Sequence, residues 1–323
     1  VFAEFSGNRL HPVSLELIGK ARTLAKAVPG FKVRAVLVGN GVSACAEELR
    51  HYGVAEIAVY DDPALGYFRA DAYAACVEDY IRSCRPSVVL VGATALGRSL
   101  APRIATRFHT GLTADCTKLE LRENTDLVQI RPAFGGNIMA QIITPNTRPQ
   151  FATVRYKVMD APIREAAAAG NVLARRLPAG VKASRANLVS AFPVPPRKTI
   201  SDAEILVVGG RGLRKESDLS LVQELAELLG GDWAVTRPLV EKGWAGNDRQ
   251  IGLSGRTVRP RLIITCGVSG AIQFTACMNA SEHIVAINTD RTAPIFETAH
   301  VAIVGDLYDT IPVLINELKE ARA

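Results

Sequence analysis

The stretch RLIITCGVSGAIQFTACMNASEHIVAINTDRTAPIFETAHVAIVGD, from Arg261 to Asp306, decides the fold of the C-terminal part of this chain. Leu262–Cys266 is an apolar run of strand length, and the glycines and serine of Gly267–Gly270 predict that a helix opens directly after it. His283–Asn288 repeats the strand signal and ends in an Asn-Thr-Asp loop. Helix N-termini and the loops at the carboxyl ends of parallel strands bind nucleotides. The pattern therefore predicts a dinucleotide site.

The same stretch resembles the FAD-binding signature of the alpha subunit of electron-transfer flavoproteins, because GVSGAIQ, IVAIN, APIF and IVGD follow one another at the expected intervals. VVGGRG at Val207–Gly212, TRP at Thr236–Pro238 and NDRQIGLSG at Asn247–Gly255 extend the resemblance upstream. It covers essentially the whole chain. The resemblance implies FAD as the cofactor, a beta subunit as the partner, and electron exchange with flavin dehydrogenases such as acyl-CoA dehydrogenases.

The chain of 323 residues is long enough for two domains of ordinary size. In the first half, short apolar runs such as Val33–Val38 and Val88–Val91 alternate with helix-length stretches, which is typical of a parallel α/β sheet. Leu127–Val158 holds three closely spaced strand patterns and predicts an antiparallel addition to that sheet. Ala161–Lys198 is interpreted as the crossover between domains.

We therefore expect an α/β protein with two domains. Residues 1–198 form a parallel-sheet scaffold resembling nucleotide hydrolases, with the antiparallel addition, and the family resemblance implies that this scaffold docks the beta subunit. Residues 199–323 form a doubly wound FAD-binding domain. The glycines of Gly92–Gly97 follow a strand and superficially suggest phosphate binding, but they fit no P-loop, so a scaffold role is favoured there.

The bulk composition excludes several function classes. The net charge of +6 is spread along the chain without a Lys/Arg-rich block, and aromatic residues are 6%, so nucleic-acid binding is not expected. We expect the positive charge to serve an acidic cofactor or an acidic partner surface instead. No apolar run reaches the roughly 18 residues of a membrane span. Six cysteines without a CxxC pair predict reduced core thiols in a reducing cytoplasm, and neither they nor the five scattered histidines predict a metal site. Val1 is not Met, which leaves a removed leader open.

Two other functions remain as alternatives. An autonomous nicotinamide-dependent oxidoreductase would carry G-x-G-x-x-G after the strand Glu204–Val208, but Gly210-Arg211-Gly212 is followed by Leu213, Arg214 and Lys215. The missing third glycine argues against that class. An adenine-nucleotide-binding regulator is the second alternative, and it would carry a nucleotide without a flavin.

Two arginines stand at predicted strand ends. Arg211 lies in a glycine turn, where its guanidinium can reach a phosphate, and Arg237 follows Thr236 and precedes Pro238, which predicts an extended backbone at Arg237. The resemblance implies that Arg237 lies beside the flavin, where its charge favours the reduced anionic form.

Two positions depart from the family pattern. Gln250–Gly255 is a turn whose Ser254 hydroxyl, by resemblance, approaches the flavin N5 region, but Leu253 stands where the family commonly has Gln. Phe274 follows Gln273 where well-known members have a His that reaches the flavin. Both changes remove a hydrogen-bonding side chain. The change at Phe274 suggests a specialised branch that bifurcates electrons from NADH, and the sequence leaves this branch and the ordinary electron shuttle open.

The remaining candidates belong to the predicted helix start and the strand ends. Ser269 is expected to cap the helix or bind the ribityl-pyrophosphate part, Asn288 and Asp306 to bind the adenosine end, and Asp290 to cap the turn after it. The full set of expected cofactor-binding residues is Arg211, Thr236, Arg237, Gln250, Leu253, Ser254, Gly255, Gly267, Ser269, Gly270, Gln273, Phe274, Asn288, Asp306 and Leu307.

Overall fold

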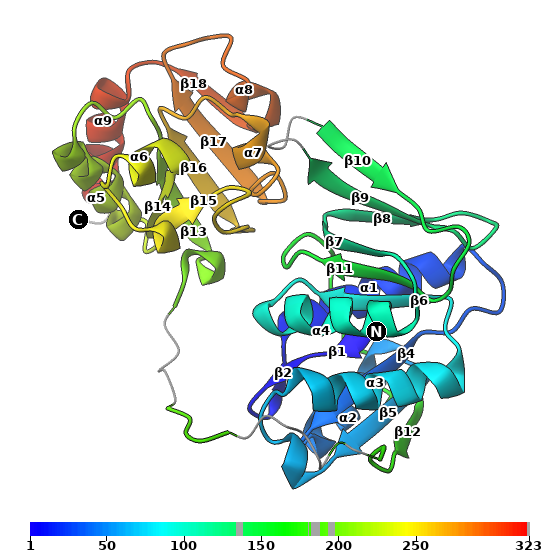
Figure 1. The fold of residues 1–323 in the computed structure, drawn as a ribbon. Helices are drawn as coiled ribbons and strands as arrows, with labels where there is room; N and C mark the ends of the chain where they lie inside the picture. The colour runs from blue at the N-terminus through cyan, green and yellow to red at the C-terminus, as the bar shows by residue number, and fades with distance from the viewer. Residues whose placement is uncertain (134–137, 180, 182–187, 193–197, 322–323) are drawn as a thin grey trace. The chain divides into compact units, whose positions relative to one another are not determined.

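The computed structural model describes residues 1–133, 138–179, 181, 188–192 and 198–321. These residues form two compact units, drawn in blue to green and in yellow-green to red in Figure 1. The first unit takes in Val1–Ala133 and the described residues from Met139 to Phe192, and the second the described residues from Lys198 to Ala321. Each unit has hydrophobic clusters of its own.

The first unit is built on parallel strands. One sheet has the order β1-β4-β5-β12 and another the order β6-β11-β7, and neighbouring strands within both are parallel. The strands are β1 (Phe2–Ala3), β4 (Arg34–Gly39), β5 (Glu56–Asp61), β6 (Val88–Gly92), β7 (Leu112–Cys116), β11 (Gln150–Val154) and β12 (Asn171–Ala174). The parallel sheet predicted from the apolar runs of the first half is confirmed.

The antiparallel addition contains a different set of strands from the one that its sequence pattern indicates. A three-stranded sheet of order β10-β9-β8 contains β8 (Lys118–Leu121), β9 (Leu127–Ala133) and β10 (Ile138–Ile142), and β8 and β9 pair antiparallel. The third expected strand does not join it, since β11 lies between β6 and β7 and is parallel to both. All five residues of β11 are buried, as in the centre of a parallel sheet covered on both faces.

The stretch expected to be only a crossover also contributes to the first unit. Within it, β12 pairs in parallel with β5 and forms an edge of the sheet. Part of Ala161–Lys198 is therefore sheet, and its proline-rich end at 193–197 lies outside the described residues. The helices of this unit are α1 (Pro12–Lys26), α2 (Ser43–Leu49), α3 (Ala70–Cys84) and α4 (Ala95–Arg107), and a two-stranded antiparallel ribbon, β2 (Phe5–Ser6) and β3 (Arg9–Leu10), precedes α1.

The second unit contains one six-stranded parallel sheet of order β15-β14-β13-β16-β17-β18. Its strands are β13 (Ile205–Gly209), β14 (Asp232–Thr236), β15 (Gln250–Ile251), β16 (Leu262–Cys266), β17 (His283–Asn288) and β18 (Val301–Val304). Numbered from its own first strand, the order is 3-2-1-4-5-6, which is the doubly wound order of dinucleotide-binding folds. The predicted fold class of this part is confirmed.

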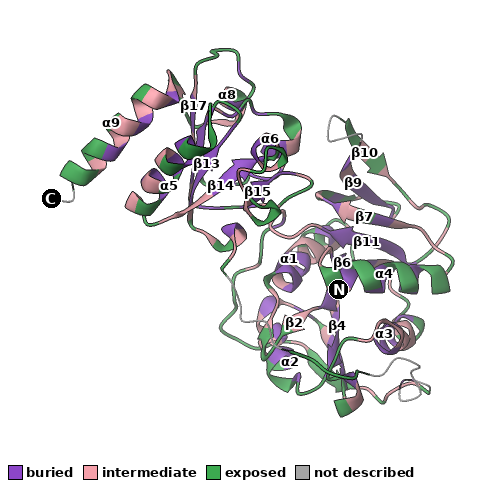
Figure 2. Cartoon of the chain, turned by 60° about the vertical axis from the view of Figure 1, so that its left-hand side comes forward, coloured by how far each residue is buried: buried purple, intermediate pink, exposed green. Residues whose placement is uncertain are grey.

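Helices cover both faces of this sheet because its strands are apolar on both sides. Val207 and Ile264 pack with Val222 of α5 (Leu219–Leu228) and Ile311 of α9 (Leu307–Glu320). The neighbouring strand positions, including Leu206 and Ile263, pack on the other face with the segment that carries α7 (Ile272–Thr275) and α8 (Ile295–Thr298). Figure 2 shows the strands buried between helices whose outer faces are exposed. The short helix α6 (Arg237–Glu241) follows β14.

Candidate nucleotide-binding site

The strand order of the second unit reverses between β13 and β16, which are hydrogen-bonded neighbours. The chain leaves β13 toward one side of the sheet and leaves β16 toward the other, so a crevice opens between the two loops at the carboxyl ends of these strands. In doubly wound sheets this switch point is where ligands bind. The loops after β13 and β16 begin at Gly210 and Gly267.

Three glycines let these two loops cross in direct backbone contact. The amide of Gly210 donates to the carbonyl of Cys266, and the amide of Gly212 donates to the carbonyl of Gly267, both at 2.9 Å. A Cβ atom on Gly212 would lie 2.7 Å from the Cα atom of Gly267, and one on Gly210 would lie 2.3 Å from the Gly267 carbonyl oxygen. Gly267 also has φ +64, a left-handed conformation that favours glycine. Any side chain here would force the crossing loops apart.

A cavity of about 340 Å³ lies at this edge of the sheet. It is walled by the loops after β13, β16, β17 and β18. Six residues expected from the sequence line it, namely Arg211, Gly267, Ser269, Asn288, Asp306 and Leu307. Four separate strand ends therefore contribute to one site, as the parallel topology requires.

The Asn288 side chain ties the end of β17 to the neighbouring loop. Its Nδ2 donates to the carbonyl of Val268 at 2.8 Å, and its Oδ1 accepts from the amide of Asp290 at 3.0 Å. Asp290 in turn accepts from the amide and the hydroxyl of Thr292 at 2.9 and 2.7 Å. The hydroxyl hydrogen bond from Thr292 lowers the pKa of the Asp290 carboxyl. Asp290 thus caps the following turn, as expected.

Asp306 carries the negative charge at the start of α9. Its Oδ1 accepts from the amide of Tyr308 at 2.9 Å, which caps the helix, and its Oδ2 accepts from the Arg214 guanidinium at 3.0 Å. The side chain is about one-third exposed and borders the cavity. A carboxylate held in this way can accept hydrogen bonds from the hydroxyls of a ribose.

A second group of expected residues comes together around the turn after β15. The buried Gln250 donates from Nε2 to the Ser254 hydroxyl at 2.8 Å, and the amide of Leu253 donates to the carbonyl of Gln273 at 3.0 Å. A Cβ atom on Gly255 would lie 2.3 Å from the Gln250 carbonyl oxygen. The Ser254 hydroxyl is exposed and keeps its hydrogen to donate outward.

Two local expectations are wrong. Arg237 is not extended; it is the first residue of α6, and the extended residue is Thr236 before it. Pro238 is tolerated because the first helical turn has no partner for its missing N–H. Arg237 is 67% exposed, and its Nε donates to Glu241 Oε1 at 2.8 Å.

The helix expected to open directly from the Gly-Ser turn begins later. The helix α7 starts at Ile272 after the non-helical Ala271, and its start carries no side-chain cap. The carbonyl of Ser269 instead accepts from the amide of Ile295, and a Cβ atom on Gly270 would lie 2.1 Å from that amide nitrogen. The turn is therefore shaped by packing on the start of α8.

Phe274 is buried within a core cluster that also contains Leu206, Ile263 and Met278. It does not line the cavity at the strand ends. The resemblance places this position beside the flavin, and that stays a prediction; in the structure the Phe274 side chain fills part of the core.

The cavity lining also holds residues that were not expected from the sequence, two of them with large polar side chains. Arg214 and Tyr308 border the cavity beside Arg211 and Asp306. The basic cluster from Arg211 to Lys215 marked this turn as positively charged, but no local signal pairs Arg214 with a tyrosine 94 positions away.

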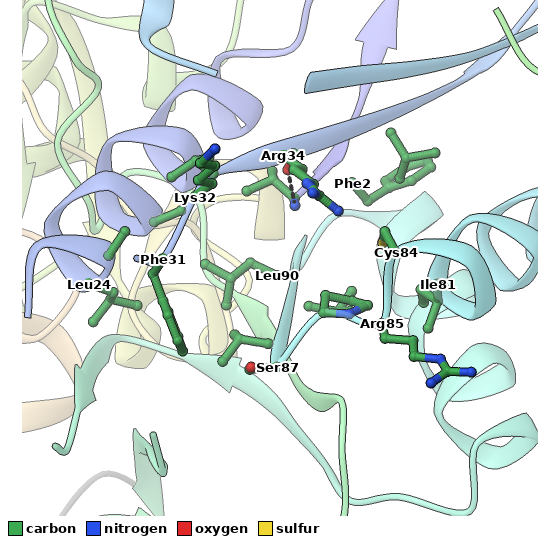
Figure 3. Close-up of a pocket in the computed structure, with 18 of the residues that line it drawn as sticks. Phe2, Leu24, Phe31, Lys32, Arg34, Ile81, Cys84, Arg85, Ser87 and Leu90 are labelled. Carbon is green, nitrogen blue, oxygen red and sulfur yellow. Dashed lines mark hydrogen bonds between the residues drawn. The ribbon is translucent and has the colours of Figure 1, made fainter. Parts of the chain in front are cut away.

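A second cavity, also about 340 Å³, lies in the first unit (Figure 3). Apolar side chains such as Leu24, Phe31 and Leu90 form much of its wall, with Cys84 and Arg85 beside them. It borders Arg34 and Val88, the first residues of β4 and β6. It therefore lies at the amino ends of the strands, whereas parallel sheets bind ligands at the carboxyl ends. We therefore do not assign the nucleotide to it.

The Gly92–Gly97 segment supports the scaffold interpretation. Thr94 caps α4 by accepting from the amide of Gly97 at 3.0 Å, and its hydroxyl donates to the Glu4 carboxylate at 2.6 Å. A carboxylate thus stands at the helix start, where a phosphate would be repelled. A Cβ atom on Gly97 would lie 1.9 Å from the Gly92 carbonyl oxygen, so this glycine serves close packing between helix and strand.

The cysteines and the acidic side chains offer no sign of metal chemistry in the described part of the chain. None of the six cysteines, all of them among the described residues, forms a disulfide, and burial raises the pKa of the Cys266 thiol to about 12. Across the described residues, no cluster of three or more His, Cys, Asp or Glu side chains could hold a metal ion. Among the helices that the structure describes, none has the length and apolar character to cross a membrane.

Comparison with known proteins agrees with the site. Residues 1–179 match the electron transfer flavoprotein domain, and residues 199–279 match the electron transfer flavoprotein FAD-binding domain. The chain is 51% identical over 319 residues to the lactate dehydrogenase (NAD(+),ferredoxin) subunit LctC of Acetobacterium woodii, covering 99% of this chain and 76% of that protein.

Two further relatives align over nearly the whole chain. The electron transfer flavoprotein subunit alpha of Thermoanaerobacterium thermosaccharolyticum is 43% identical, with 100% of this chain and 98% of that protein covered. Protein FixB of Azorhizobium caulinodans is 40% identical, with 97% and 86% covered. The chain belongs to the electron transfer flavoprotein alpha subunit family, and its cofactor is FAD.

Proposed function

We propose that this chain pairs with an electron transfer flavoprotein beta subunit and that the heterodimer bifurcates electrons from NADH. The observation that carries the bifurcating assignment is the 51% identity to a subunit of an enzyme named for NAD(+) and ferredoxin. The apolar Leu253 and Phe274, where the commoner family pattern is polar, support a branch distinct from the ordinary shuttle.

The residues present fit FAD on structural grounds. The glycine crossing brings the backbone of the loop after β13 into contact with that after β16, so a pyrophosphate can approach this backbone without meeting a Cβ atom. The cavity beside it contains the Arg211 guanidinium and the Asp306 carboxylate, which suit a phosphate and a ribose respectively. The loop after β13 lacks the G-x-G-x-x-G motif of nicotinamide-dinucleotide-binding proteins.

We assign roles to the two groups of residues on this basis. Arg211, Asn288 and Asp306 hold the adenosine and pyrophosphate end, while Arg237, Gln250 and Ser254 face the flavin end. Bound FAD supplies the electron-transfer chemistry. The protein contributes binding, orientation and a positive charge at Arg237, which favours negative charge on the cofactor.

The test of this function is an anaerobic NADH titration of the chain copurified with its beta subunit. We expect two FAD per heterodimer and rapid flavin reduction by NADH. One FAD together with AMP, and reduction only by a dehydrogenase and its substrate, would contradict bifurcation and indicate an ordinary shuttle. Adenine nucleotide bound without any flavin would instead favour a regulator, and hydride transfer by the isolated chain an autonomous oxidoreductase.

The electron-exchanging partner is proposed to be a flavin dehydrogenase. The family supports dehydrogenase partners in general, and acyl-CoA dehydrogenase is the class suggested by the sequence resemblance. The LctC relative is named for a lactate dehydrogenase, so reduction assays with lactate and with an acyl-CoA substrate separate the two. We further propose a reducing cytoplasm as the compartment, supported by six cysteines of which none forms a disulfide among the described residues.

The charge at Arg237 gives a prediction about potential. Arg237→Gln is expected to lower the two-electron flavin potential by about 30 mV, equivalent to a tenfold change in the ratio of affinities for reduced and oxidised FAD. Glu241→Gln is expected to raise it, because Glu241 partly neutralises Arg237 in an exposed ion pair. Lys242→Gln removes a nearby positive charge that stacks on Trp244 and serves as the control. Equal shifts in Arg237→Gln and Lys242→Gln would contradict a specific role of Arg237.

A further inference from the structure

We propose that Arg214, held in place by Tyr308, is a specificity-determining residue that makes the site prefer FAD over FMN by recognising the adenosine half of the cofactor. The inference rests on the proposed placement of the adenosine end in the cavity beside Asp306. It concerns two residues that carry no role in the site as derived from the sequence.

Tyr308 contacts both the backbone and the side chain of Arg214. The phenol hydroxyl accepts a hydrogen bond from the Arg214 backbone amide at 2.8 Å, and the guanidinium carbon lies 4.4 Å from the centre of the Tyr308 ring. A cation placed over an aromatic face at this distance is attracted by the ring. One side chain on α9 therefore fixes both the backbone and the side-chain direction of an arginine in the loop after β13.

The same hydroxyl connects a third segment. Tyr308 Oη donates to Asp218 Oδ2 at 2.5 Å, and this oxygen also accepts from the amide of Lys215 at 3.1 Å. Asp218 is 7% exposed and lies immediately before α5. The loop after β13, the start of α5 and the start of α9 are thus joined at one hydroxyl, although β13 and β18 are separated by β16 and β17 in the sheet.

Stability alone does not account for this arrangement. The Arg214 side chain is 72% exposed, and exposed ion pairs contribute little to folding. What the contacts do fix is the position of a positive charge on the cavity wall, 3.0 Å from the Asp306 carboxylate. An arginine stacked on an aromatic ring and paired to a carboxylate loses less freedom when it binds a ligand.

The charges of the cavity explain why this position matters for a dinucleotide. Its lining holds two arginines, Arg211 and Arg214, and two aspartates, Asp290 and Asp306. These four charges cancel. Without Arg214 the lining would carry one net negative charge, which would repel a pyrophosphate, and Asp306 would lose the partner that orients Oδ2. Arg214 thus offsets the negative charge of the lining, so that the cavity can hold both a carboxylate that binds the ribose and a negatively charged pyrophosphate.

The test compares cofactors that differ in the adenosine half. Flavin is removed from the chain in complex with its beta subunit, and binding of FAD, ADP and FMN is measured by calorimetry for wild type and for Arg214→Gln. We expect FAD and ADP each to bind about tenfold more weakly to the variant, with FMN unchanged, because the variant lacks the positive charge that Arg214 presents to the adenosine half of the cofactor. Arg214→Lys keeps the charge without the planar stack and is expected to recover part of the loss.

Arg261→Gln is the matched control. Arg261 is also 72% exposed and also forms an ion pair, with Glu204 at 3.6 Å, but it lies just before β16, away from the cavity at the strand ends. We expect it to leave all three affinities unchanged. Tyr308→Phe keeps the ring and removes the hydroxyl, and it is expected to weaken FAD and ADP binding by about threefold, because the Arg214 backbone loses its hydrogen bond to that hydroxyl.

Two results would overturn the inference: unchanged FAD and ADP binding in Arg214→Gln, or equal weakening of FAD and FMN, which would indicate general damage to the fold. Failure of the wild-type complex to bind FAD would instead contradict the proposed function, so the two failures are distinguishable.

Discussion

Replacing Gly267 with alanine is expected to weaken FAD binding by at least a hundredfold, or roughly 2.7 kcal/mol. The new Cβ atom would lie 2.8 Å from Gly212 Cα and 2.9 Å from Leu307 Cδ2, and the backbone atom cannot move without opening the loop crossing. The same change is expected to cost about 3 kcal/mol of unfolding free energy in the second unit, from the left-handed conformation and the clash together.

The control for this prediction is Gly230→Ala. Gly230 has φ +69, close to the +64 of Gly267, but no atom lies within 4 Å of its Cβ position. It therefore reports the conformational cost alone, about 1–2 kcal/mol, with FAD affinity unchanged. Thermal unfolding and fluorescence titration of the flavin-free proteins measure both quantities. Equal losses of stability and equal FAD affinities in the two variants would contradict the claim that Gly267 is needed for the close approach of the loops.

Removing the Asp306 side chain is the second large change. In Asp306→Ala, FAD affinity is expected to fall about a hundredfold, since hydrogen bonds to a charged group contribute about 1.5–3 kcal/mol each. Stability is expected to fall by about 1 kcal/mol because Asp306 Oδ1 caps α9 through the amide of Tyr308. Calorimetric titration with FAD and thermal unfolding separate the two effects.

The variant Asp306→Asn separates the two roles of Asp306, which are to cap α9 and to bind FAD. Asn caps helices as well as Asp, so Asp306→Asn is expected to keep the stability of wild type while FAD binds about tenfold more weakly. Asp309→Ala removes a carboxylate from the same helical turn, outside the cavity lining, and should leave binding unchanged. A wild-type FAD affinity in Asp306→Ala would refute the proposed position of the adenosine end.

Much of the fold and part of the site could be predicted from the sequence, where the signal is local. The strands Leu262–Cys266 and His283–Asn288 have the bounds expected from their apolar runs. Asn288 and Asp306 could be placed at one edge because strands joined by helical crossovers run parallel and their carboxyl ends meet there. The motif resemblance identified the family and its cofactor, which the comparisons confirm.

Other features were decided only by tertiary structure, because they depend on contacts between residues far apart in the chain. The apolar pattern of Gln150–Val154 predicts a strand, but it does not say that the strand lies between β6 and β7 in a parallel sheet. The Gly-Ser turn predicts a helix start, but packing of Gly270 on Ile295 delays that helix. The contact of Arg214 with Tyr308 joins positions that the sheet order alone brings together. The sequence by itself determined the strands, the family and the residue types of the site, whereas tertiary packing decided which side chains face the cavity.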